Sequence, residues 1–260
     1  MWGNQTMKLT LKALSLAVLG AASTFTFAEE APASEHTISG NIGVFSSYNL
    51  RGITNAPENK NATLQGGLDY SHASGFYAGY WGSTLSYGET PSIEKPNPDD
   101  AFENDFYAGY KGSMTEDLGY TLGFTYYYYY DLGTSDANGF ETMLGLNYKD
   151  FGLTAQTLLE DTTWGNAGDT YFLGSYSYGL PRDFSLNTKL GLYYYDDSAG
   201  DFIPEEGTTE TFGFRHFTVG LSHPLAETGA TMSVDYILGG YDRMDTKQKN
   251  KVVLGLSYAF

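Results

Sequence analysis

The chain ends in Val252-Val253-Leu254-Gly255-Leu256-Ser257-Tyr258-Ala259-Phe260, a stretch in which every second residue is large and apolar or aromatic. The residues between them are smaller or more polar. Because side chains on a β-strand point alternately to opposite faces, such a stretch forms a strand with one apolar face. This pattern is typical of the wall of a membrane β-barrel, which has lipid outside and water inside.

The same alternation recurs upstream, and twelve such segments run from His36 to Phe260. At about 3.3 Å per residue and a tilt near 40°, ten residues rise about 25 Å, the height of the apolar belt of outer-membrane barrels. An even number of antiparallel strands returns the C-terminus to the periplasmic side, where the first strand begins. We therefore predict an all-β fold, a 12-stranded antiparallel transmembrane β-barrel with periplasmic N- and C-termini. The predicted strands are residues 36–49, 60–71, 76–86, 103–112, 118–130, 139–149, 153–160, 170–179, 184–195, 212–222, 230–241 and 251–260.

The connections between these segments are alternately short and long. The short ones are rich in Gly, Pro, Asp or Ser, which favour tight turns, and we expect them on the periplasmic side. They span residues 72–75, 113–117, 150–152, 180–183 and 223–229. The longer ones, which we expect outside the cell, span residues 50–59, 87–102, 131–138, 161–169, 196–211 and 242–250.

The large apolar side chains share one face in most of the predicted strands. Tyrosines gather toward the strand ends, as in the aromatic girdles of membrane barrels. The alternative is a soluble β-sandwich or barrel, but its exterior would then consist of Gly, Ser and Thr. The predicted lipid-facing residues are Ile38, Ile42, Val44, Leu64, Leu68, Tyr70, Phe76, Ala78, Tyr80, Leu122, Phe124, Tyr126, Tyr128, Tyr130, Phe140, Leu144, Leu146, Tyr148, Leu186, Leu190, Leu192, Tyr194, Met232, Val234, Tyr236 and Leu238.

The predicted strand 212–222 does not keep a single face. Phe214 has one parity, whereas Phe217 has the other. A β-bulge near Arg215 and His216 would return both aromatic residues to the same face.

Composition narrows the possible functions. The chain has no Cys and 39 Tyr and Phe residues in total (23 and 16), and its formal net charge is −17. This charge argues against sequence-independent binding of nucleic acid, which requires Lys and Arg to displace counterions, and it favours cations as solutes. After the first thirty residues, no stretch of about 20 apolar residues remains, so a helical membrane protein is excluded.

The first residues are typical of an export signal. Lys8 and Lys12 precede an apolar core at residues 14–20, and Thr26-Phe27-Ala28 has the small-x-small pattern of a cleavage site. A membrane anchor or a buried helix is the alternative, but the apolar core is too short for an anchor. We expect residues 1–28 to be a signal peptide, residues 29–35 a short periplasmic segment and residues 36–260 the barrel, placed in the bacterial outer membrane.

The polar faces of the strands predict the lining of the lumen. Twelve strands spaced about 4.8 Å apart and tilted by about 40° enclose a cylinder near 24 Å across, or about 10 Å after side chains are subtracted. Small solutes fit this width, although the same polar groups could instead pair across the interior and plug it. The pore-lining candidates are Gln65, Asp69, Asp105, Tyr107, Lys111, Glu141, Asn147, Lys149, Gln156, Asn187, Lys189 and Asp235, with Asn41 also facing inward.

Two of the long connections are strongly acidic and predict a negative extracellular mouth. Residues 196–211 contain Asp196, Asp197, Asp201, Glu205 and Glu206 without a basic residue, and residues 87–102 add Glu89, Glu94, Asp99 and Asp100. Such a rim raises the local concentration of cations. Plain solvated loop surface is the alternative. No spacing matches a calcium-binding loop, so we predict no metal site and no cofactor.

Enzymatic activity has little support in the sequence. Of the four histidines, His36, His72 and His223 fall at the predicted periplasmic ends, and His216 stands alone in a strand. No Ser, His and acid set converges on one rim. The acidic loops leave open a hydrolase that acts through carboxylates, but we predict no enzymatic activity.

Several motifs in the first four predicted strands resemble the TorF family of porins. The matching stretches are Arg51-Gly52-Ile53, Gln65-Gly66-Gly67-Leu68-Asp69-Tyr70, Gly75-Phe76-Tyr77-Ala78-Gly79-Tyr80-Trp81-Gly82-Ser83 and Asp105-Phe106-Tyr107-Ala108-Gly109-Tyr110. The resemblance implies an outer-membrane porin-like barrel without a defined substrate or catalytic residue. In Arg51-Gly52, Gly allows a sharp turn, and Arg51 is a candidate for the extracellular mouth, over the acidic rim or against lipid phosphate.

These observations predict an outer-membrane porin for passive diffusion of small hydrophilic solutes, with a mild preference for cations. The alternative is a non-conducting scaffold or adhesion barrel that acts through its extracellular loops. Tyr258 and Phe260 are candidates for the signal that the barrel-assembly machinery reads. The other expected partners are outer-membrane lipid and lipopolysaccharide.

Overall fold

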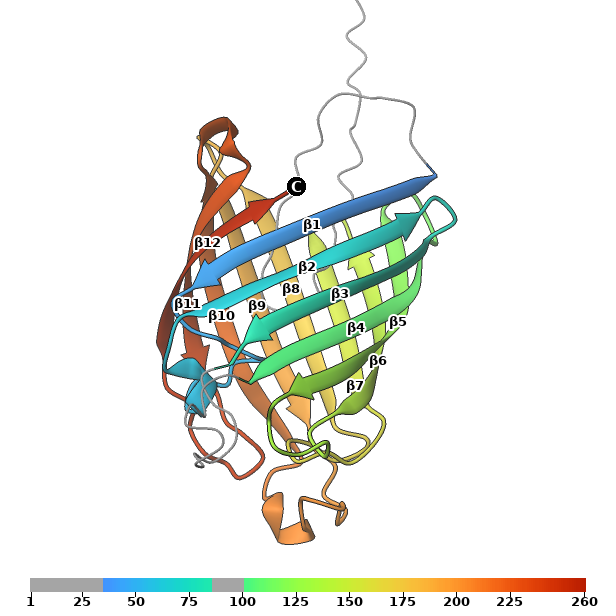
Figure 1. The fold of residues 1–260 in the computed structure, drawn as a ribbon, viewed down its shortest axis with the longest axis vertical. Coiled ribbons are helices and arrows are strands. Elements are labelled where there is room, and N and C mark those ends of the chain that lie inside the picture. Colours follow the sequence, from blue (N-terminus) through green and yellow to red (C-terminus); the bar gives the residue numbers. More distant parts are fainter. Residues whose placement is uncertain (1–34, 86–100) are drawn as a thin grey trace, which may run out of the picture.

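The computed structural model describes residues 35–85 and 101–260. The predicted signal peptide, most of the 29–35 segment and the acidic residues Glu89, Glu94, Asp99 and Asp100 lie outside the described residues. Twelve antiparallel strands form one closed barrel, in which each strand pairs with its neighbours in sequence and β12 pairs with β1 (Figure 1). The predicted fold class is confirmed. The strands are β1 (His36–Phe45), β2 (Thr63–His72), β3 (Phe76–Thr84), β4 (Phe102–Ser113), β5 (Leu118–Tyr130), β6 (Gly139–Tyr148), β7 (Phe151–Leu158), β8 (Thr170–Gly179), β9 (Ser185–Tyr194), β10 (Phe212–Pro224), β11 (Ala230–Gly239) and β12 (Lys251–Ala259).

Within residues 35–85 and 101–260, three short 3-10 helices lie in the connections, namely η1 (Pro57–Asn59), η2 (Glu205–Gly207) and η3 (Ala226–Thr228). In the described part of the chain, no helix combines the length and the apolar character needed to cross a membrane. We call the end of the barrel with the short connections the turn end, and the end with the long connections the loop end. β1 begins and β12 finishes at the turn end.

The seam between β1 and β12 closes the barrel. Its register runs from Asn41 opposite Ala259 to Phe45 opposite Gly255. Beyond the end of β12, Gly40 and Phe260 exchange two backbone hydrogen bonds of 2.8 and 2.9 Å. A Cβ atom at Gly40 would lie 2.6 Å from the Phe260 ring, so glycine allows this close approach.

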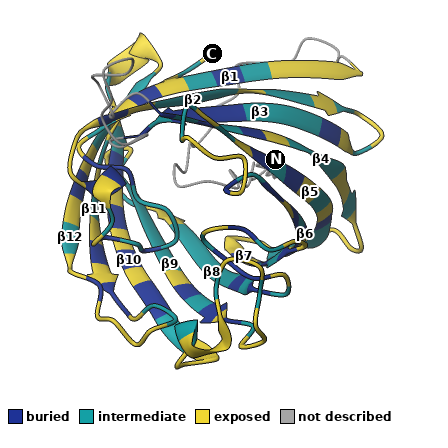
Figure 2. Cartoon of the chain, turned by 60° about the horizontal axis from the view of Figure 1, so that its bottom comes forward, coloured by how far each residue is buried: buried dark blue, intermediate teal, exposed yellow. Residues whose placement is uncertain are grey.

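The outer face of the barrel is apolar along all strands. Ile38 is 76% exposed and Leu144 is 58% exposed, although both are aliphatic. Burial alternates along the strands, so exposed and less exposed residues form bands around the wall (Figure 2). Most large aliphatic residues of the strands point outward, and the inward face carries polar and small residues together with buried aromatic ones such as Tyr127 and Tyr193. A continuous exposed apolar surface of this kind is stable in contact with lipid.

The predicted bulge in β10 is confirmed. In the pairing with β9, Phe214 lies opposite Leu192 and His216 lies opposite Gly191, so Arg215 is an extra residue. Arg215 and His216 are both buried, at 4% exposure each. The bulge thus turns two consecutive side chains to the inside of the barrel while Phe214 and Phe217 both stay outside.

β1 is shorter than predicted, and this difference shapes the lumen. The predicted strand continued to residue 49, but β1 ends at Phe45. The following residues Ser47 and Tyr48 are buried, because the chain turns into the barrel instead of extending outward. We call residues 46–62 the inward loop.

Candidate functional site

A tight turn in the inward loop aims Arg51 into the lumen. The Ile53 amide donates to the Leu50 carbonyl at 2.8 Å and closes the turn. Arg51 and Gly52 have positive φ angles of 46° and 74°. A Cβ atom at Gly52 would lie 2.5 Å from Cβ of His216. Glycine is therefore required at this position by both its backbone conformation and its packing.

The Arg51 side chain reaches the far wall of the barrel. Its Nη2 lies 2.6 Å from Oε2 of Glu141 on β6, and its Nη1 donates to the Tyr193 hydroxyl on β9 at 3.2 Å. Tyr127 on β5 donates to the same Glu141 oxygen at 2.7 Å. The side chains of Arg51 and Glu141 are only 8% and 2% exposed. We call Arg51, Glu141, Tyr127 and Tyr193 the Arg51 cluster.

Arg215 and His216, in the bulge of β10, support the Arg51 cluster through hydrogen bonds. Arg215 Nε donates to the Arg51 carbonyl at 3.1 Å. The Arg51 guanidinium also lies over the ring of Tyr171, 5.0 Å from its centroid, and Tyr171 is hydrogen-bonded to His216 at 2.7 Å. Burial lowers the pKa of Arg51, but Glu141, Tyr127 and Tyr193 together raise it by more, so the pKa lies above its ordinary value. Arg51 therefore stays positively charged in the lumen.

The inward loop also contacts a second carboxylate. The Tyr48 hydroxyl donates to Glu103 on β4, and Tyr129 donates to the other Glu103 oxygen at 3.3 Å. The Tyr48 ring packs with Trp81 and Leu85 in an apolar cluster. The loop is thus fixed on both sides of Arg51, and it narrows the loop-end half of the lumen.

We call the part of the lumen lined by the Arg51 cluster, Glu103 and Asp105 the narrow zone. Asp105 is its most unusual group. It faces the lumen from β4, is 0% exposed, and neither of its carboxylate oxygens has a hydrogen-bond partner among the described residues. Oε1 of Glu141 is in the same situation. Buried carboxylates without partners are rare because desolvation is costly. With Glu103, three carboxyl groups of the described residues face the guanidinium groups of Arg51 and Arg215 in this zone.

The turn-end half of the lumen is more open. Asn41, Asp69, Lys189 and Asp235 point inward and are only half-buried there. On the inner face of the wall, the Tyr107 hydroxyl on β4 donates to an Asp69 carboxylate oxygen on β2 at 2.6 Å. The lumen therefore combines a polar vestibule at the turn end with a narrow zone toward the loop end.

The structure places the other pore-lining candidates at separate points on the wall. Gln65, Asn147 and Gln156 face inward from β2, β6 and β7, and Gln156 is buried. Lys111 lies 4.7 Å from the centroid of the Tyr77 ring. Asn187 accepts a 2.8 Å hydrogen bond from Ser177.

Two predicted positions need correction. Lys149 lies in the turn after β6, with φ of 52°, and its side chain is 55% exposed and 3.6 Å from Asp117, so it does not line the lumen. Arg51 does not lie at the mouth over the acidic rim, because Glu141 binds it inside the barrel. The other mouth candidates are at the loop end, where Asp197, Asp201, Glu205 and Glu206 are exposed and Asp196 is half-buried.

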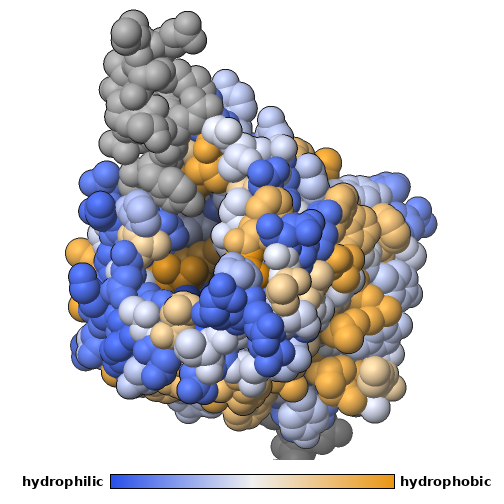
Figure 3. Space-filling view, turned by 90° about the horizontal axis from the view of Figure 1, so that it is seen from below, coloured by the Kyte–Doolittle hydropathy of each residue, from blue (hydrophilic) through white to orange (hydrophobic). Residues whose placement is uncertain are grey.

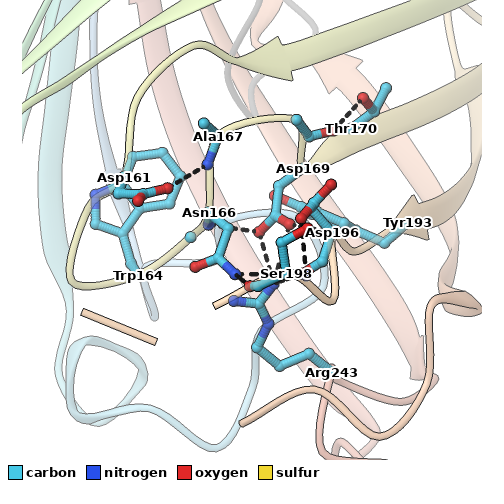
Figure 4. A network of polar contacts seen from close by, with 12 residues as sticks. Asp161, Trp164, Asn166, Ala167, Asp169, Thr170, Tyr193, Asp196, Ser198 and Arg243 are labelled. Atoms are coloured by element: carbon cyan, nitrogen blue, oxygen red, sulfur yellow. Dashed lines mark hydrogen bonds and ion pairs between the residues drawn. The ribbon is translucent and has the colours of Figure 1, made fainter. Parts of the chain in front are cut away.

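An ion pair ties the loops together at the loop end (Figure 4). Arg243 Nη2 lies 2.9 and 3.0 Å from the two carboxylate oxygens of Asp169, which also accepts from the Asp196 amide at 2.8 Å. Asn166 donates to the carbonyls of Asp196 and Ser198. Burial raises the pKa of the Asp169 carboxyl, although Arg243 acts in the opposite direction. Viewed from this end, the molecule is hollowed, and hydrophilic residues surround the depression (Figure 3).

Several residues of the narrow zone were not among the predicted pore-lining residues. Tyr127 and Tyr193 alternate with the lipid-facing tyrosines Tyr126, Tyr128 and Tyr194, and this parity alone places them in the lumen. The inward direction of the loop carried no such signal.

The closed barrel, its apolar outer face and its polar lumen define the class of the fold as a porin-like β-barrel. Residues 29–257 match the family described as bacterial protein of unknown function (Gcw_chp), and the chain belongs to this family. No curated protein matches the sequence. The resemblance to the TorF porins stays a prediction, whereas the porin-like fold that it implied is confirmed.

Solved porin structures share this fold at low sequence identity. The KdgM porin is 11% identical, with 85% of this chain and 99% of that chain covered and a TM-score of 0.53. A structure of the KdgM porin in complex with disordered oligogalacturonate is 10% identical, with 86% and 98% covered and a TM-score of 0.50. The NanC porin is 14% identical, with 85% and 99% covered and a TM-score of 0.49.

Proposed function

We propose that the protein is a non-enzymatic channel for passive diffusion of small hydrophilic solutes across the bacterial outer membrane. The main support is a closed barrel whose outer face is apolar and whose polar lumen is narrowed by Arg51, held to Glu141 on the opposite wall. A narrow zone built from charged side chains selects solutes by width and charge.

We also propose how the chain is exported and oriented. A signal peptide is cleaved after Ala28, residues 29–35 lie in the periplasm, and the turn end with both termini faces the periplasm. The assembly machinery reads Tyr258 and Phe260, and the outer face contacts lipid and lipopolysaccharide. The short connections at one end and the long ones at the other support this orientation.

The exposed acidic residues at the loop end support a mild preference for cations, because their summed field raises the local concentration of cations. Asp105 contributes less to this field, because a fully buried carboxyl without a hydrogen-bond partner among the described residues favours its neutral form.

Single-channel recording after reconstitution into planar bilayers tests the channel. Discrete openings that scale with salt concentration support it. The absence of openings from a folded, heat-modifiable protein would contradict it.

Reversal potentials in a salt gradient then test the cation preference. Neutralisation of Asp196, Asp197, Glu205 and Glu206 together is expected to reduce it, and Asp105→Asn is expected to change it less. Lys60→Gln, an exposed change in the inward loop, is the control and should leave selectivity nearly unchanged. Equal reversal potentials in all variants would remove these carboxylates from the mechanism.

The burial of the narrow zone favours one second candidate, a non-conducting barrel that acts through its loops. Glu103, Asp105 and Glu141 are each at most 1% exposed, which suits a filled interior as well as a narrow pore. Arg51→Ser/Glu141→Ser distinguishes the two, because it removes both partners of the ion pair. If the wild type is silent and this variant conducts, the Arg51 cluster closes the barrel.

A further inference from the structure

Two histidines face each other across the first strand pair at the turn end. His36 begins β1 and His72 ends β2, and they are direct partners in the register. Their ring centroids are 5.0 Å apart. Ligand atoms of Glu35, His36 and His72 all lie within 4.8 Å of one another. Over residues 35–85 and 101–260, this is the one group of three or more such side chains that is close enough to share a metal ion.

Hydrogen bonds orient both imidazole rings. Nδ1 of His36 is 2.8 Å from the Tyr70 hydroxyl, whereas Nδ1 of His72 accepts a 3.1 Å hydrogen bond from the Ser74 amide and is 2.7 Å from Oγ of Ser74. In metal sites, a ligating His commonly donates from its second ring nitrogen to such a partner, and the Tyr70 hydroxyl can play this part for His36. The Ser74 amide instead holds His72 in the tautomer with the proton on Nε2, so metal binding requires this ring to turn or to give up that bond.

The backbone that carries Glu35 is fixed as well. The Ala73 amide, in the turn after β2, donates to the Glu35 carbonyl at 2.8 Å. This bond extends the β1–β2 pairing by one step beyond His36 and His72. The backbone of Glu35 is therefore held beside the two histidines, and its exposed side chain can turn toward them.

We propose that Glu35, His36 and His72 bind a divalent transition-metal ion such as Zn²⁺, with one ring nitrogen of each histidine and a carboxylate oxygen as ligands. Two imidazoles and a carboxylate are donors that suit Zn²⁺ and its neighbours, whereas Ca²⁺ and Mg²⁺ prefer oxygen donors alone. Ligands bound at about 2.0–2.2 Å around a tetrahedral ion lie roughly 3.3–3.6 Å apart. The side chains thus need to approach by about 1 Å, and the exposed Glu35 and His36 can rotate to do so.

The site lies outside the permeation path. His36 and His72 have the same parity as Ile38 and Tyr70, so their side chains point away from the lumen. Zinc binding therefore does not depend on the proposed channel activity, and either proposal can fail without the other.

Zinc titration of the full barrel in detergent, with a chromophoric chelator as competitor, tests the proposal. We expect one Zn²⁺ per chain, bound at least about tenfold more weakly after His36→Ala or His72→Ala. His223→Ala is the matched control, because His223 is at the same end but packs against Phe184, with ring centroids 4.4 Å apart. Its zinc affinity should equal that of the wild type. Tyr70→Phe removes only the supporting hydroxyl and should weaken binding less than loss of a ring.

X-ray absorption at the zinc edge provides a second readout, in which two imidazoles should contribute to the first coordination shell. The proposal is overturned if zinc does not bind to the folded barrel, or if binding survives in His36→Ala/His72→Ala. It is also overturned if Ca²⁺ competes as well as Ni²⁺ does, because the donors would then be carboxylates alone. Heat-modifiability of each variant confirms that a loss of binding is not a loss of folding.

Discussion

Arg51 and Glu141 form a buried ion pair between a loop and the opposite wall of the barrel. Taking both charges out of water is costly, and Tyr127 and Tyr193 reduce this cost through their hydrogen bonds. Breaking such a pair from one side leaves an uncompensated charge, whereas replacing both partners is often nearly neutral. The pair thus favours one position of the inward loop without necessarily adding to the stability of the barrel.

A double-mutant cycle tests this view. Arg51→Met alone should lower the free energy of unfolding by about 3–5 kcal/mol, because Glu141 stays buried without its charged partner. Arg51→Met/Glu141→Gln should recover most of this loss. Urea unfolding of the barrel in lipid vesicles measures both values. Additive losses in the double variant would show that the two side chains are not coupled.

At the scale of single residues, the sequence predicted which side chains face the lumen better than it predicted which side chains contact one another. The alternation in β4 and β6 placed Asp105 and Glu141 in the lumen. The partner of Glu141 comes from a loop, and no periodicity specifies where a loop goes. Glu35, His36 and His72 were not predicted as a group either. The register of β1 and β2 brings His36 and His72 together, and the pattern within a single strand does not contain this register.

At the scale of the strands, most boundaries were predicted to within a few residues, and β5 and β8 agree fully with their predicted limits. The errors fall where the chain leaves the wall. β1 ends early because the inward loop finds partners inside the barrel, and β6 ends at Tyr148 because Lys149 adopts a positive φ in the turn. Such ends depend on tertiary contacts, which a local pattern does not contain.

The bulge in β10 makes a direct prediction about register. Deleting Arg215 leaves Phe214 outside, His216 inside and Phe217 outside, which is regular alternation. The variant should therefore still assemble into a heat-modifiable barrel, although the bond from Arg215 to the Arg51 carbonyl is lost. Deleting Thr188 in the middle of β9 is the control, because it turns Leu190 and Leu192 into the lumen. Failure of the Arg215 deletion to fold would show that the bulge is required for assembly.

Two variants of Phe260, which lies at the seam between β1 and β12, distinguish two roles of this residue. Deleting Phe260 removes its ring and both backbone hydrogen bonds to Gly40, and we expect less of the folded form in the outer membrane. Phe260→Ala keeps the backbone bonds and removes only the ring. If the aromatic ring is the assembly signal, both variants should lose folded protein equally, as measured by heat-modifiability. A defect confined to the deletion would assign the role to closure of the seam, and normal assembly of both would exclude either role.

For the molecule as a whole, the apolar outer face is the feature on which the fold depends, and most of it was predicted because alternation is a local property of each strand. A charge in the middle of this face should be costly in lipid. Leu144→Arg, at a position that is 58% exposed, should lower the free energy of unfolding in vesicles by about 2–4 kcal/mol. Ser175→Arg on the inner face of β8 is the control and should cost much less, since the inner face contacts water.

The same pair of variants distinguishes a membrane barrel from a soluble one. In a soluble barrel with water outside, Leu144→Arg would be tolerated, and the inner substitution would be the damaging one. Urea unfolding of both variants in vesicles therefore distinguishes the two architectures. Leu144→Arg is the less stable variant if the barrel lies in a membrane, and Ser175→Arg is the less stable variant if the barrel is soluble. A Leu144→Arg protein as stable as the wild type, or a wild-type barrel that stays folded in buffer without detergent, would show that the exposed leucines do not face lipid.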